Sequence, residues 1–346
     1  AVSYPALLPQ FAGLVGDVMS SRFDELRVFS GNGNHALANA ISDRLGFPTG
    51  DVTITQYPNE NIFVRLNESV REKDVFVVQS LSAPLSDRIM ELLIMLDACR
   101  RASAGRVTAF VPFFACGRTH KKDQPRVPIT ARLLADMIQT AGAQQLITLD
   151  LHAGQIQGFF SIPVDELSAM GLLVRHIQER HWNDAVVVSS DMGFAKRARN
   201  FAEQLDLPLA IVEKRQKQSM RQPAAVVTDG GLYSIIGDVR NRQCILVDDE
   251  IVTGRSVSEA AEMLMAAGAA SVHATIVHAG LVEGAIERLR NSAISELITT
   301  DTLPIPNDHG WDGLKVLSVA PLLAEVIQRI HSGISVGTIF TRKLVF

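Results

Sequence analysis

The stretch Cys244-Ile-Leu-Val-Asp-Asp-Glu-Ile-Val-Thr-Gly-Arg-Ser256 joins an apolar run to two adjacent carboxylates and a short loop that carries hydroxyl groups. Residues 245–247 have the length and branching of a buried parallel strand, and residues 257–267 have helical periodicity with good helix formers. The loop therefore joins the carboxyl end of a strand to the start of a helix. In open α/β sheets, such junctions are where ligands bind.

The residues of this loop suit a ribose phosphate. The hydroxyls of Thr253 and Ser256 and the backbone N–H groups of the first helical turn can hold a phosphate dianion, and Gly254 lets the backbone approach it. The carboxylates of Asp248 and Asp249 would repel that phosphate, so their partners are the hydroxyls of an attached sugar, or a metal ion. From these residues alone, a strand followed by an acidic turn and a capped helix remains an open alternative.

The composition describes a soluble globular protein. At 346 residues the chain suits two domains of about 150 residues each. Its apolar fraction of 47% and net charge of −4 offer no basic stripe for nucleic acid. No apolar run reaches the roughly 20 residues that span a bilayer and no signal-peptide pattern is present, so we expect a cytoplasmic protein without membrane contact. Three widely spaced cysteines, Cys99, Cys116 and Cys244, indicate neither a disulfide framework nor a zinc site.

Strand-like and helix-like segments alternate along most of the chain. Strand-like runs lie at 26–29, 75–79, 107–111, 146–149, 186–189, 209–212, 244–247 and 272–277. Helical stretches lie at 35–45, 87–101, 129–141, 194–205 and 257–267. This alternation predicts an α/β protein with mostly parallel sheets covered by helices on both faces. The phrases Thr140-Ala-Gly-Ala143 and Ala266-Ala-Gly-Ala269 end helices in both halves and hint at a duplicated domain, although Ala-Gly-Ala is also a common helix stop.

Residues 248–256 resemble the phosphoribosyl-diphosphate (PRPP) motif of the phosphoribosyltransferase fold, Asp-Asp-x-x-x-Thr-Gly-x-Ser/Thr. A second stretch, Thr148-Leu-Asp-Leu-His-Ala-Gly-Gln-Ile-Gln-Gly-Phe-Phe-Ser-Ile-Pro-Val-Asp165, is similar to a segment typical of the ribose-phosphate diphosphokinase (PRPP synthetase) family. Shorter matches follow in the family's order: Ile89-Met-Glu-Leu-Leu-Ile-Met-Leu-Asp-Ala98, Pro128-Ile-Thr-Ala-Arg132 and Pro321-Leu-Leu-Ala-Glu325. The resemblance covers about residues 26 to 346.

The resemblance implies two tandem phosphoribosyltransferase-like domains, each a mostly parallel sheet flanked by helices. We expect a first domain at 23–168 and a second domain, which carries the ribose-phosphate loop, at 169–325. The last segment, 326–346, is expected to return to the first domain. Residues 1–22 fall outside the match and are expected to form a partly ordered N-terminal extension.

A basic loop, Arg118-Thr-His-Lys-Lys-Asp-Gln-Pro-Arg126, lies between the strand that ends at 111 and the helix that starts near 129. Such a loop can close over a polyphosphate, although a solvated basic loop is the alternative. In the family the corresponding loop, Arg-Gln-Asp-(Lys/Arg)-Lys, contacts ATP. The residues that match it are Arg118, Lys121 and Lys122, whereas Thr119 and His120 depart from it.

A second basic cluster, Lys214-Arg-Gln-Lys217, aligns with the family's mobile Lys-Arg-Arg catalytic loop. Lys214 and Arg215 are retained, and Gln216 replaces the last arginine. The resemblance implies transfer of the β,γ-diphosphoryl group of ATP to the anomeric hydroxyl of ribose 5-phosphate, which gives PRPP and AMP. Such a transfer needs positive charge and in-line positioning, which Lys214, Arg215 and Arg118 suit.

The resemblance also implies a magnesium cofactor, which would bridge phosphate oxygens. His152 and Asp191 stand where the family places protein ligands near this metal. Magnesium prefers oxygen ligands, so a histidine ligand is unusual on general grounds. Without the resemblance, we would interpret His152 as a hydrogen-bonded structural histidine.

The sequence departs from the family where the adenine is bound. The family has Phe-(Ser/Pro)-Asp-(Gly/Asn)-Glu, which a neighbouring subunit supplies to the base, and this chain has Tyr57-Pro-Asn-Glu-Asn61. Asn59 and Asn61 therefore replace acids with amides, which can still accept a hydrogen bond but lack the charge. A site shared between subunits implies a homo-oligomer built from dimers, with a hexamer as the form that the family suggests.

The ribose loop also differs from the family's frequent Asp-Thr-Ala-Gly-Thr. It reads Val252-Thr-Gly-Arg-Ser256, closer to the transferase form, and Arg255 adds a possible phosphate donor. The leading hypothesis is a magnesium-dependent ribose-phosphate diphosphokinase that uses ATP and ribose 5-phosphate. Because the changes gather in the nucleotide half, a non-catalytic regulatory or scaffolding homologue is the alternative. A phosphoribosyltransferase that uses PRPP and a base rests on the ribose loop alone.

Overall fold

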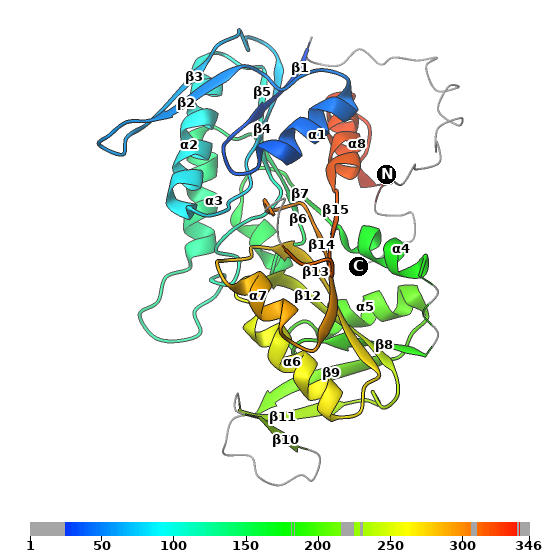
Figure 1. Ribbon diagram of the computed structural model, residues 1–346. Coiled ribbons are helices and arrows are strands. Elements are labelled where there is room, and N and C mark those ends of the chain that lie inside the picture. Colours follow the sequence, from blue (N-terminus) through cyan, green and yellow to red (C-terminus); the bar gives the residue numbers. More distant parts are fainter. Residues whose placement is uncertain are drawn as a thin grey trace.

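The computed structural model describes residues 25–180, 182, 184–215, 225–228, 231–305, 310–337 and 339. These residues form two α/β halves, which Figure 1 shows one above the other. Each half is built on its own mostly parallel sheet. No helix in the described part of the chain is both long and apolar enough to cross a membrane.

The first half contains a five-stranded parallel sheet of order β1-β4-β5-β6-β7. Its strands are β1 (Leu26–Ser30), β4 (Asp74–Val78), β5 (Arg106–Val111), β6 (Gln145–Leu149) and β7 (Val164–Leu167). Its helices are α1 (His35–Leu45), α2 (Leu85–Arg101), α3 (Thr130–Ala141) and the short 3-10 helix η1 (Gly154–Phe159). Every residue of β4 is buried, as expected for a β-branched run covered on both faces.

A separate antiparallel hairpin, β2 (Val52–Gln56) and β3 (Ile62–Leu66), projects to one side of this half (Figure 1). The turn that joins the two strands contains residues 57–61. Both strands are partly buried or exposed along their length, and neither was predicted.

The second half contains an eight-stranded sheet of order β10-β11-β9-β8-β12-β13-β14-β15. Its strands are β8 (Ala185–Ser189), β9 (Leu209–Arg215), β10 (Ala225–Thr228), β11 (Gly231–Ile236), β12 (Gln243–Ile251), β13 (Ser271–Ala279), β14 (Ile294–Thr300) and β15 (Leu314–Leu317). Its helices are α4 (Met170–Gln178), α5 (Ala195–Leu205), α6 (Arg255–Ala266) and α7 (Ala285–Arg290). A further helix, α8 (Ala320–His331), packs on α1 of the first half, as Figure 1 shows.

The strand order of the second sheet reverses at β8. Strand β9 lies on one side of β8 and β12 lies on the other, and both pair with β8 in parallel. The loops that leave the carboxyl ends of β8 and β12 therefore diverge to opposite faces, which opens a crevice between them. This topology places Asp191 and the stretch from Asp248 onward at the same edge of the sheet.

Strand β12 is longer than the run predicted from its apolar residues. Its pairing with β13 continues past Val247 through Asp248 and Glu250 to Ile251. The carboxylates expected in the loop therefore lie in the strand itself, because strand pairing uses backbone groups and does not end where the side chains become polar. The loop that follows is short, and α6 begins at Arg255, two residues earlier than predicted.

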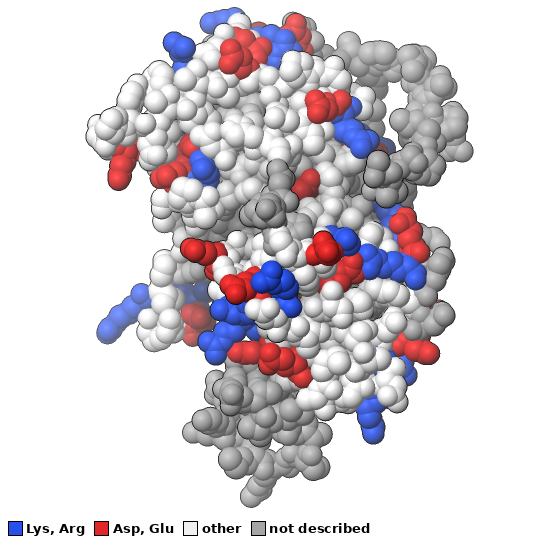
Figure 2. Space-filling view, in the orientation of Figure 1, with Lys and Arg blue, Asp and Glu red and all other residues white. Residues whose placement is uncertain are grey.

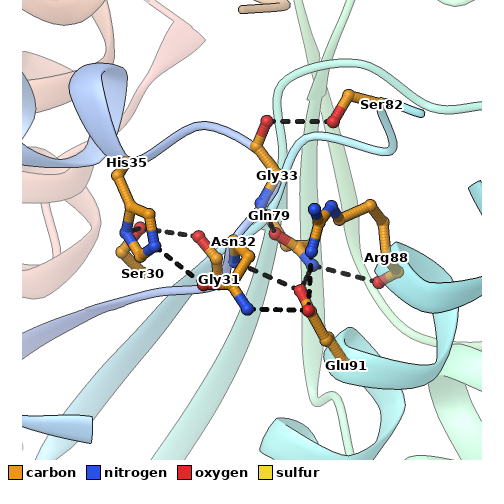
Figure 3. A network of polar contacts seen from close by, with 9 residues as sticks. All are labelled: Ser30, Gly31, Asn32, Gly33, His35, Gln79, Ser82, Arg88 and Glu91. Carbon is orange, nitrogen blue, oxygen red and sulfur yellow. Dashed lines mark hydrogen bonds and ion pairs between the residues drawn. The ribbon is translucent and has the colours of Figure 1, made fainter. Parts of the chain in front are cut away.

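A buried polar network braces the carboxyl ends of β1 and β4 (Figure 3). The carboxylate of Glu91 accepts hydrogen bonds from Asn32 N, Asn32 Nδ2 and Gln79 Nε2 at 3.1, 2.8 and 2.9 Å. Arg88 Nη1 lies 2.6 Å from the same carboxylate. Next to this network, Ser80 Oγ donates to the backbone carbonyl of Thr302 in the second half at 2.7 Å. The two halves are thus joined by hydrogen bonds close to the crevice.

Candidate functional site

A cleft of ≈ 1110 Å³ lies where the crevice of the second half faces the first half. The first half contributes His120, Lys121 and His152 to its wall. From the second half come Asp191, at the end of β8, and Asp248 and Asp249, on β12. The structure therefore brings these six predicted site residues to one cleft.

A second pocket, of ≈ 530 Å³, adjoins this cleft. His152 and Asp249 line both spaces and so form the wall between them. The second pocket is largely apolar, with Phe113 and Phe114 in its lining. Of the predicted residues, Arg118 belongs to this pocket and not to the lining of the larger cleft.

His152 and Asp249 form a hydrogen bond between the two halves, with Nδ1 2.6 Å from Oδ2. His152 follows β6, and Asp249 is buried on β12. The bond to Asp249 raises the pKa of His152, and this effect outweighs the lowering that partial burial causes. The carboxylate fixes the ring orientation through Nδ1 and leaves Nε2 as the candidate ligand atom.

Asp248 and Asp249 have opposite pKa shifts although they are adjacent. Burial raises the pKa of Asp248, and the neighbouring charge of Asp249 raises it further. Burial would also raise the pKa of Asp249, but hydrogen bonds from His152 and Asp248 outweigh it and lower the pKa. Asp249 is therefore the carboxylate held ionised, and it can accept hydrogen bonds from sugar hydroxyls.

The phosphate loop lies at the start of α6. Gly254 has a left-handed φ of 72°, and the N–H of Arg255 donates to Thr253 Oγ1 at 3.3 Å. The guanidinium of Arg255 is 2.7 Å from Glu259 on the next turn of α6. Thr253, Gly254, Arg255 and Ser256 are not among the residues that line the larger cleft. They lie beyond its acidic wall, at the N-terminus of the helix.

The donor set fits a magnesium ion held jointly with substrate, not a closed protein cage. Among the described residues there is no group of three or more His, Cys, Asp or Glu side chains that could hold a metal. One oxygen of Asp191 accepts the N–H of Phe194 at 2.8 Å, which orients the carboxylate and leaves its second oxygen as the candidate ligand. Magnesium commonly takes one or two protein ligands and completes its shell with substrate phosphates and water. Asp191 offers one such carboxylate, and His152 on the opposite side of the cleft would add a nitrogen ligand, which is uncommon for magnesium.

The basic loop after β5 reaches the cleft through only part of its length. His120 Nδ1 lies 3.0 Å from the carbonyl of Gly117, and its ring centroid is 5.9 Å from that of His152. The N–H of Thr119 bonds to the carbonyl of Cys116 at 2.9 Å. Lys121 lines the larger cleft, whereas Lys122 is exposed and lines neither space.

The remaining predicted residues lie away from these two spaces or outside the described side chains. The backbones of Lys214 and Arg215 belong to β9 and pair with Tyr233 and Leu232 of β11, but their side chains are not described. Gln216 lies outside the described residues.

Tyr57, Asn59 and Asn61 lie in the exposed turn of the β2–β3 hairpin. The N–H of Tyr57 bonds to the carbonyl of Asn61 at 2.9 Å, and the N–H of Asn61 bonds to Asn59 Oδ1 at 3.3 Å. The Tyr57 ring packs 6.2 Å from that of Phe63. These three residues line neither the cleft nor the adjoining pocket of their own chain.

Several charged residues of the site were missed in the sequence. Lys196 and Arg197, in the first turn of α5, line the larger cleft together with Glu166. Arg197 donates to the carbonyl of Leu151 and lies 3.8 Å from Glu166, so it links the two halves. The switch-point rule could have found the pair, because the helix after β8 must start at the same edge as the helix after β12.

The chain matches known proteins over most of its length. Residues 26–142 match the family model of the N-terminal domain of ribose phosphate pyrophosphokinase, and residues 217–341 match the phosphoribosyl synthetase-associated domain. The chain is 46% identical over 320 residues to a ribose-phosphate pyrophosphokinase of Clostridium acetobutylicum, covering 92% of this chain and 98% of the relative. For the enzyme of the same name in Caldanaerobacter subterraneus, the identity is 45% and the coverages are 93% and 100%.

A solved structure has the same fold over nearly its whole length. The crystal structure of phosphoribosylpyrophosphate synthetase from Mycobacterium smegmatis matches with a TM-score of 0.83 and 40% identity, covering 89% of this chain and 99% of that one. The fold class expected from the alternating segments is confirmed, and so is the family expected from residues 148–165 and the shorter matches. The chain belongs to the ribose-phosphate pyrophosphokinase (diphosphokinase) family.

Proposed function

We propose that this chain is a magnesium-dependent ribose-phosphate diphosphokinase in which the two halves bind the two substrates on opposite sides of one cleft. The observation that carries the proposal is the wall formed by His152 and Asp249. It joins the loop after β6 to the acidic end of β12, which leads into the phosphate loop. Ribose 5-phosphate would lie on the second-half side, and the polyphosphate of ATP on the first-half side.

On the sugar side, the first turn of α6 would hold the 5-phosphate through backbone N–H groups and the hydroxyls of Thr253 and Ser256. Gly254 begins that turn with its positive φ, and a Cβ there would lie 3.1 Å from the side chain of Leu289, so both conformation and packing favour glycine. Asp248 and Asp249 would accept hydrogen bonds from the ribose hydroxyls, with the ionised Asp249 the stronger acceptor. This arrangement would orient the anomeric hydroxyl toward the cleft.

On the nucleotide side, cationic side chains would neutralise the polyphosphate. Lys121 lines the cleft, and Arg118 lines the adjoining pocket. We assign Lys214 and Arg215 the role of stabilising charge during diphosphoryl transfer, on the strength of their match to the family's catalytic loop. Asp191 and His152 would hold the magnesium ion, which when bound supplies charge neutralisation across the phosphate oxygens.

We further propose that the β2–β3 hairpin serves a neighbouring subunit. Its turn residues Tyr57, Asn59 and Asn61 are exposed and line neither the cleft nor the adjoining pocket of their own chain, which is the arrangement expected of residues that complete another chain's base site. The chain would then be active as a homo-oligomer built from dimers, with a hexamer as the expected size. Sedimentation velocity measures the size of the oligomer. Complementation is tested by mixing the Tyr57→Ala variant with a Lys214→Ala variant and measuring AMP formation. Recovered activity in the mixture indicates a site shared between subunits, and no recovery indicates a self-contained site.

We retain the proposed domain division at 23–168 and 169–325. The packing of α8, which begins at Ala320, against α1 supports the return of the last segment, proposed at 326–346, to the first half. Residues 1–22 lie outside the described part of the chain. Figure 2 shows Lys and Arg side chains interspersed with Asp and Glu over the face drawn. With the composition, this supports the proposal of a cytoplasmic protein whose ligands are small molecules.

The decisive experiment is AMP formation from ATP, ribose 5-phosphate and Mg²⁺, followed in a coupled assay. We expect AMP and PRPP in equal amounts, and no AMP when the sugar phosphate or the metal is omitted. Formation of PRPP distinguishes the reaction from simple ATP hydrolysis. Binding of ribose 5-phosphate without AMP formation under any condition would instead support a non-catalytic homologue.

A further inference from the structure

Two consecutive residues at the end of β12 each take one partner from the first half. Asp249 pairs with His152, and Glu250 pairs with Arg118. The Nε atom of Arg118 lies 3.0 Å from Oε2 of Glu250. The second pair crosses between the halves at the pocket that adjoins the larger cleft, and both of its residues line that pocket.

We propose that Glu250 is a positioning residue for Arg118. The proposal rests on the diphosphokinase function above, in which Arg118 meets the polyphosphate, and it adds a residue that neither the sequence motif nor that function assigned. Glu250 holds the guanidinium in the pocket that adjoins the cleft, so that the arginine is in place before ATP arrives.

The need for a positioning partner follows from where Arg118 lies. Arg118 lies in an irregular loop between β5 and α3, and its side chain is 59% exposed. This long side chain can therefore adopt many rotamers. Glu250 is a more rigid anchor, because its side chain is only 18% exposed and its backbone pairs with His278 in the middle of the sheet. The ion pair with Glu250 therefore restricts the conformations that the Arg118 side chain can adopt.

Glu250 also affects the charge of the pocket around Arg118. Among the residues that line it, Arg118 is the one lysine or arginine, whereas the carboxylates of Asp150, Asp249 and Glu250 are all present. Glu250 therefore partly neutralises the cation that meets the polyphosphate. Replacing Glu250 should leave the affinity for ATP unchanged or higher. The loss of orientation of Arg118 should lower the rate of diphosphoryl transfer.

The test compares Glu250→Gln with Glu325→Gln. The control breaks a 2.8 Å pair with Arg329 on α8, away from the cleft. We expect kcat of Glu250→Gln to fall by about tenfold or more, with KM for ATP unchanged or lower. Glu250→Asp, which keeps the charge, should recover part of the rate. In an Arg118→Ala background the Glu250→Gln change should have no further effect, because Glu250 acts through Arg118.

An unchanged kcat in Glu250→Gln would overturn the proposal, as would an equal loss of kcat in the presence and absence of Arg118. A readout independent of turnover is the rate at which phenylglyoxal modifies Arg118, measured by peptide mass spectrometry. This rate should rise in Glu250→Gln and not in Glu325→Gln, and equal rates would show that Glu250 does not hold Arg118. If the unaltered protein forms no AMP, the proposed function fails, while the modification rates still decide whether Glu250 holds the arginine.

Discussion

His152 Nδ1 lies 2.6 Å from Asp249 Oδ2, although the two residues are 97 positions apart and belong to different halves of the molecule. The bond connects the loop after β6, which faces the nucleotide side, to the strand that leads into the phosphate loop. The two proposed substrate sites would therefore share this wall.

Removing the charge of Asp249 should weaken ribose 5-phosphate binding. In Asp249→Asn the buried acceptor becomes neutral, and we expect Kd to rise by about tenfold or more, the usual effect of losing a charged hydrogen bond. Thr253→Val, which removes a hydroxyl and keeps the shape, should weaken binding less. Isothermal titration calorimetry measures both, with the exposed Asp238→Asn as control. Unchanged affinity in both site variants would show that the sugar phosphate binds elsewhere.

Lys214→Ala should slow turnover far more than it weakens sugar binding. A cation directed at developing charge acts mainly in the transition state, so we expect kcat to fall by about a hundredfold or more. The exposed Lys315→Ala, on β15, is the matched control. If only KM for the sugar rises and kcat stays the same, Lys214 binds substrate and does not stabilise the transferred group.

The choice of nucleobase should be relaxed. Asn59 and Asn61 are amides, which can accept from an amino group or donate to a carbonyl, whereas a carboxylate only accepts. We therefore expect turnover with GTP to approach that with ATP, and the Asn59→Asp, Asn61→Glu double variant to favour ATP more strongly. Steady-state kinetics with both nucleotides measures the ratio. A strong preference for ATP in the unaltered protein would contradict the prediction and indicate that backbone groups select the base.

The stability of the fold should decrease at acid pH partly through His278. This side chain is 3% exposed, with Nδ1 2.9 Å from Thr302 Oγ1 and Nε2 3.2 Å from the carbonyl of Leu149. Burial lowers its pKa below the ordinary value of 6.5, against the raising effect of nearby carboxylates such as Asp150. The unfolded chain therefore gains a proton before the folded protein does, so stability is present above pH 6.5 and is lost as the pH falls below it.

The measurement is Tm between pH 7.5 and about 5 in the unaltered protein and in His278→Gln, which keeps hydrogen-bonding capacity without a titrating group. We expect the decrease of Tm below pH 6.5 to be smaller in the variant. His35→Gln, a change of the same kind at an exposed position on α1, should leave the decrease unaltered. Parallel curves for all three proteins would exclude His278 as a source of the acid sensitivity.

Gly33→Ala should destabilise the fold by about 2 kcal/mol or more, because overpacking against backbone is costly. A Cβ at this position would lie 2.0 Å from the backbone carbonyl oxygen of Ser80 and 2.7 Å from Gln79 Oε1, in the network of Figure 3. Chemical denaturation measures the change in the free energy of unfolding. Gly158→Ala, where a Cβ would meet nothing within 4 Å, should change it by less than about 0.5 kcal/mol. Equal small effects would mean that the loop after β1 can move away from β4.

The sequence by itself determined the fold class, the family and the order of the main elements. Every predicted apolar run from 26–29 to 272–277 became a strand, and each of the five predicted helices formed within two residues of its expected ends. These features are local: apolar periodicity and helix propensity act over a few residues and are readable in one segment at a time. The β2–β3 hairpin was not predicted, although Val52-Thr-Ile-Thr alternates as a strand does. Strands β7, β10, β11, β14 and β15 and helices α4 and α7 were also not predicted.

Only the tertiary structure decided which side chains meet. The continuation of β12 through Asp248 and Glu250 depends on its pairing with β13, which no property of the stretch itself reveals. The pairs His152–Asp249 and Arg118–Glu250 arise because strand order reverses at β8 and two separate sheets then face each other across one cleft. Such contacts join residues far apart in the chain, so their geometry is set by the packing of the halves and not by any motif that contains them.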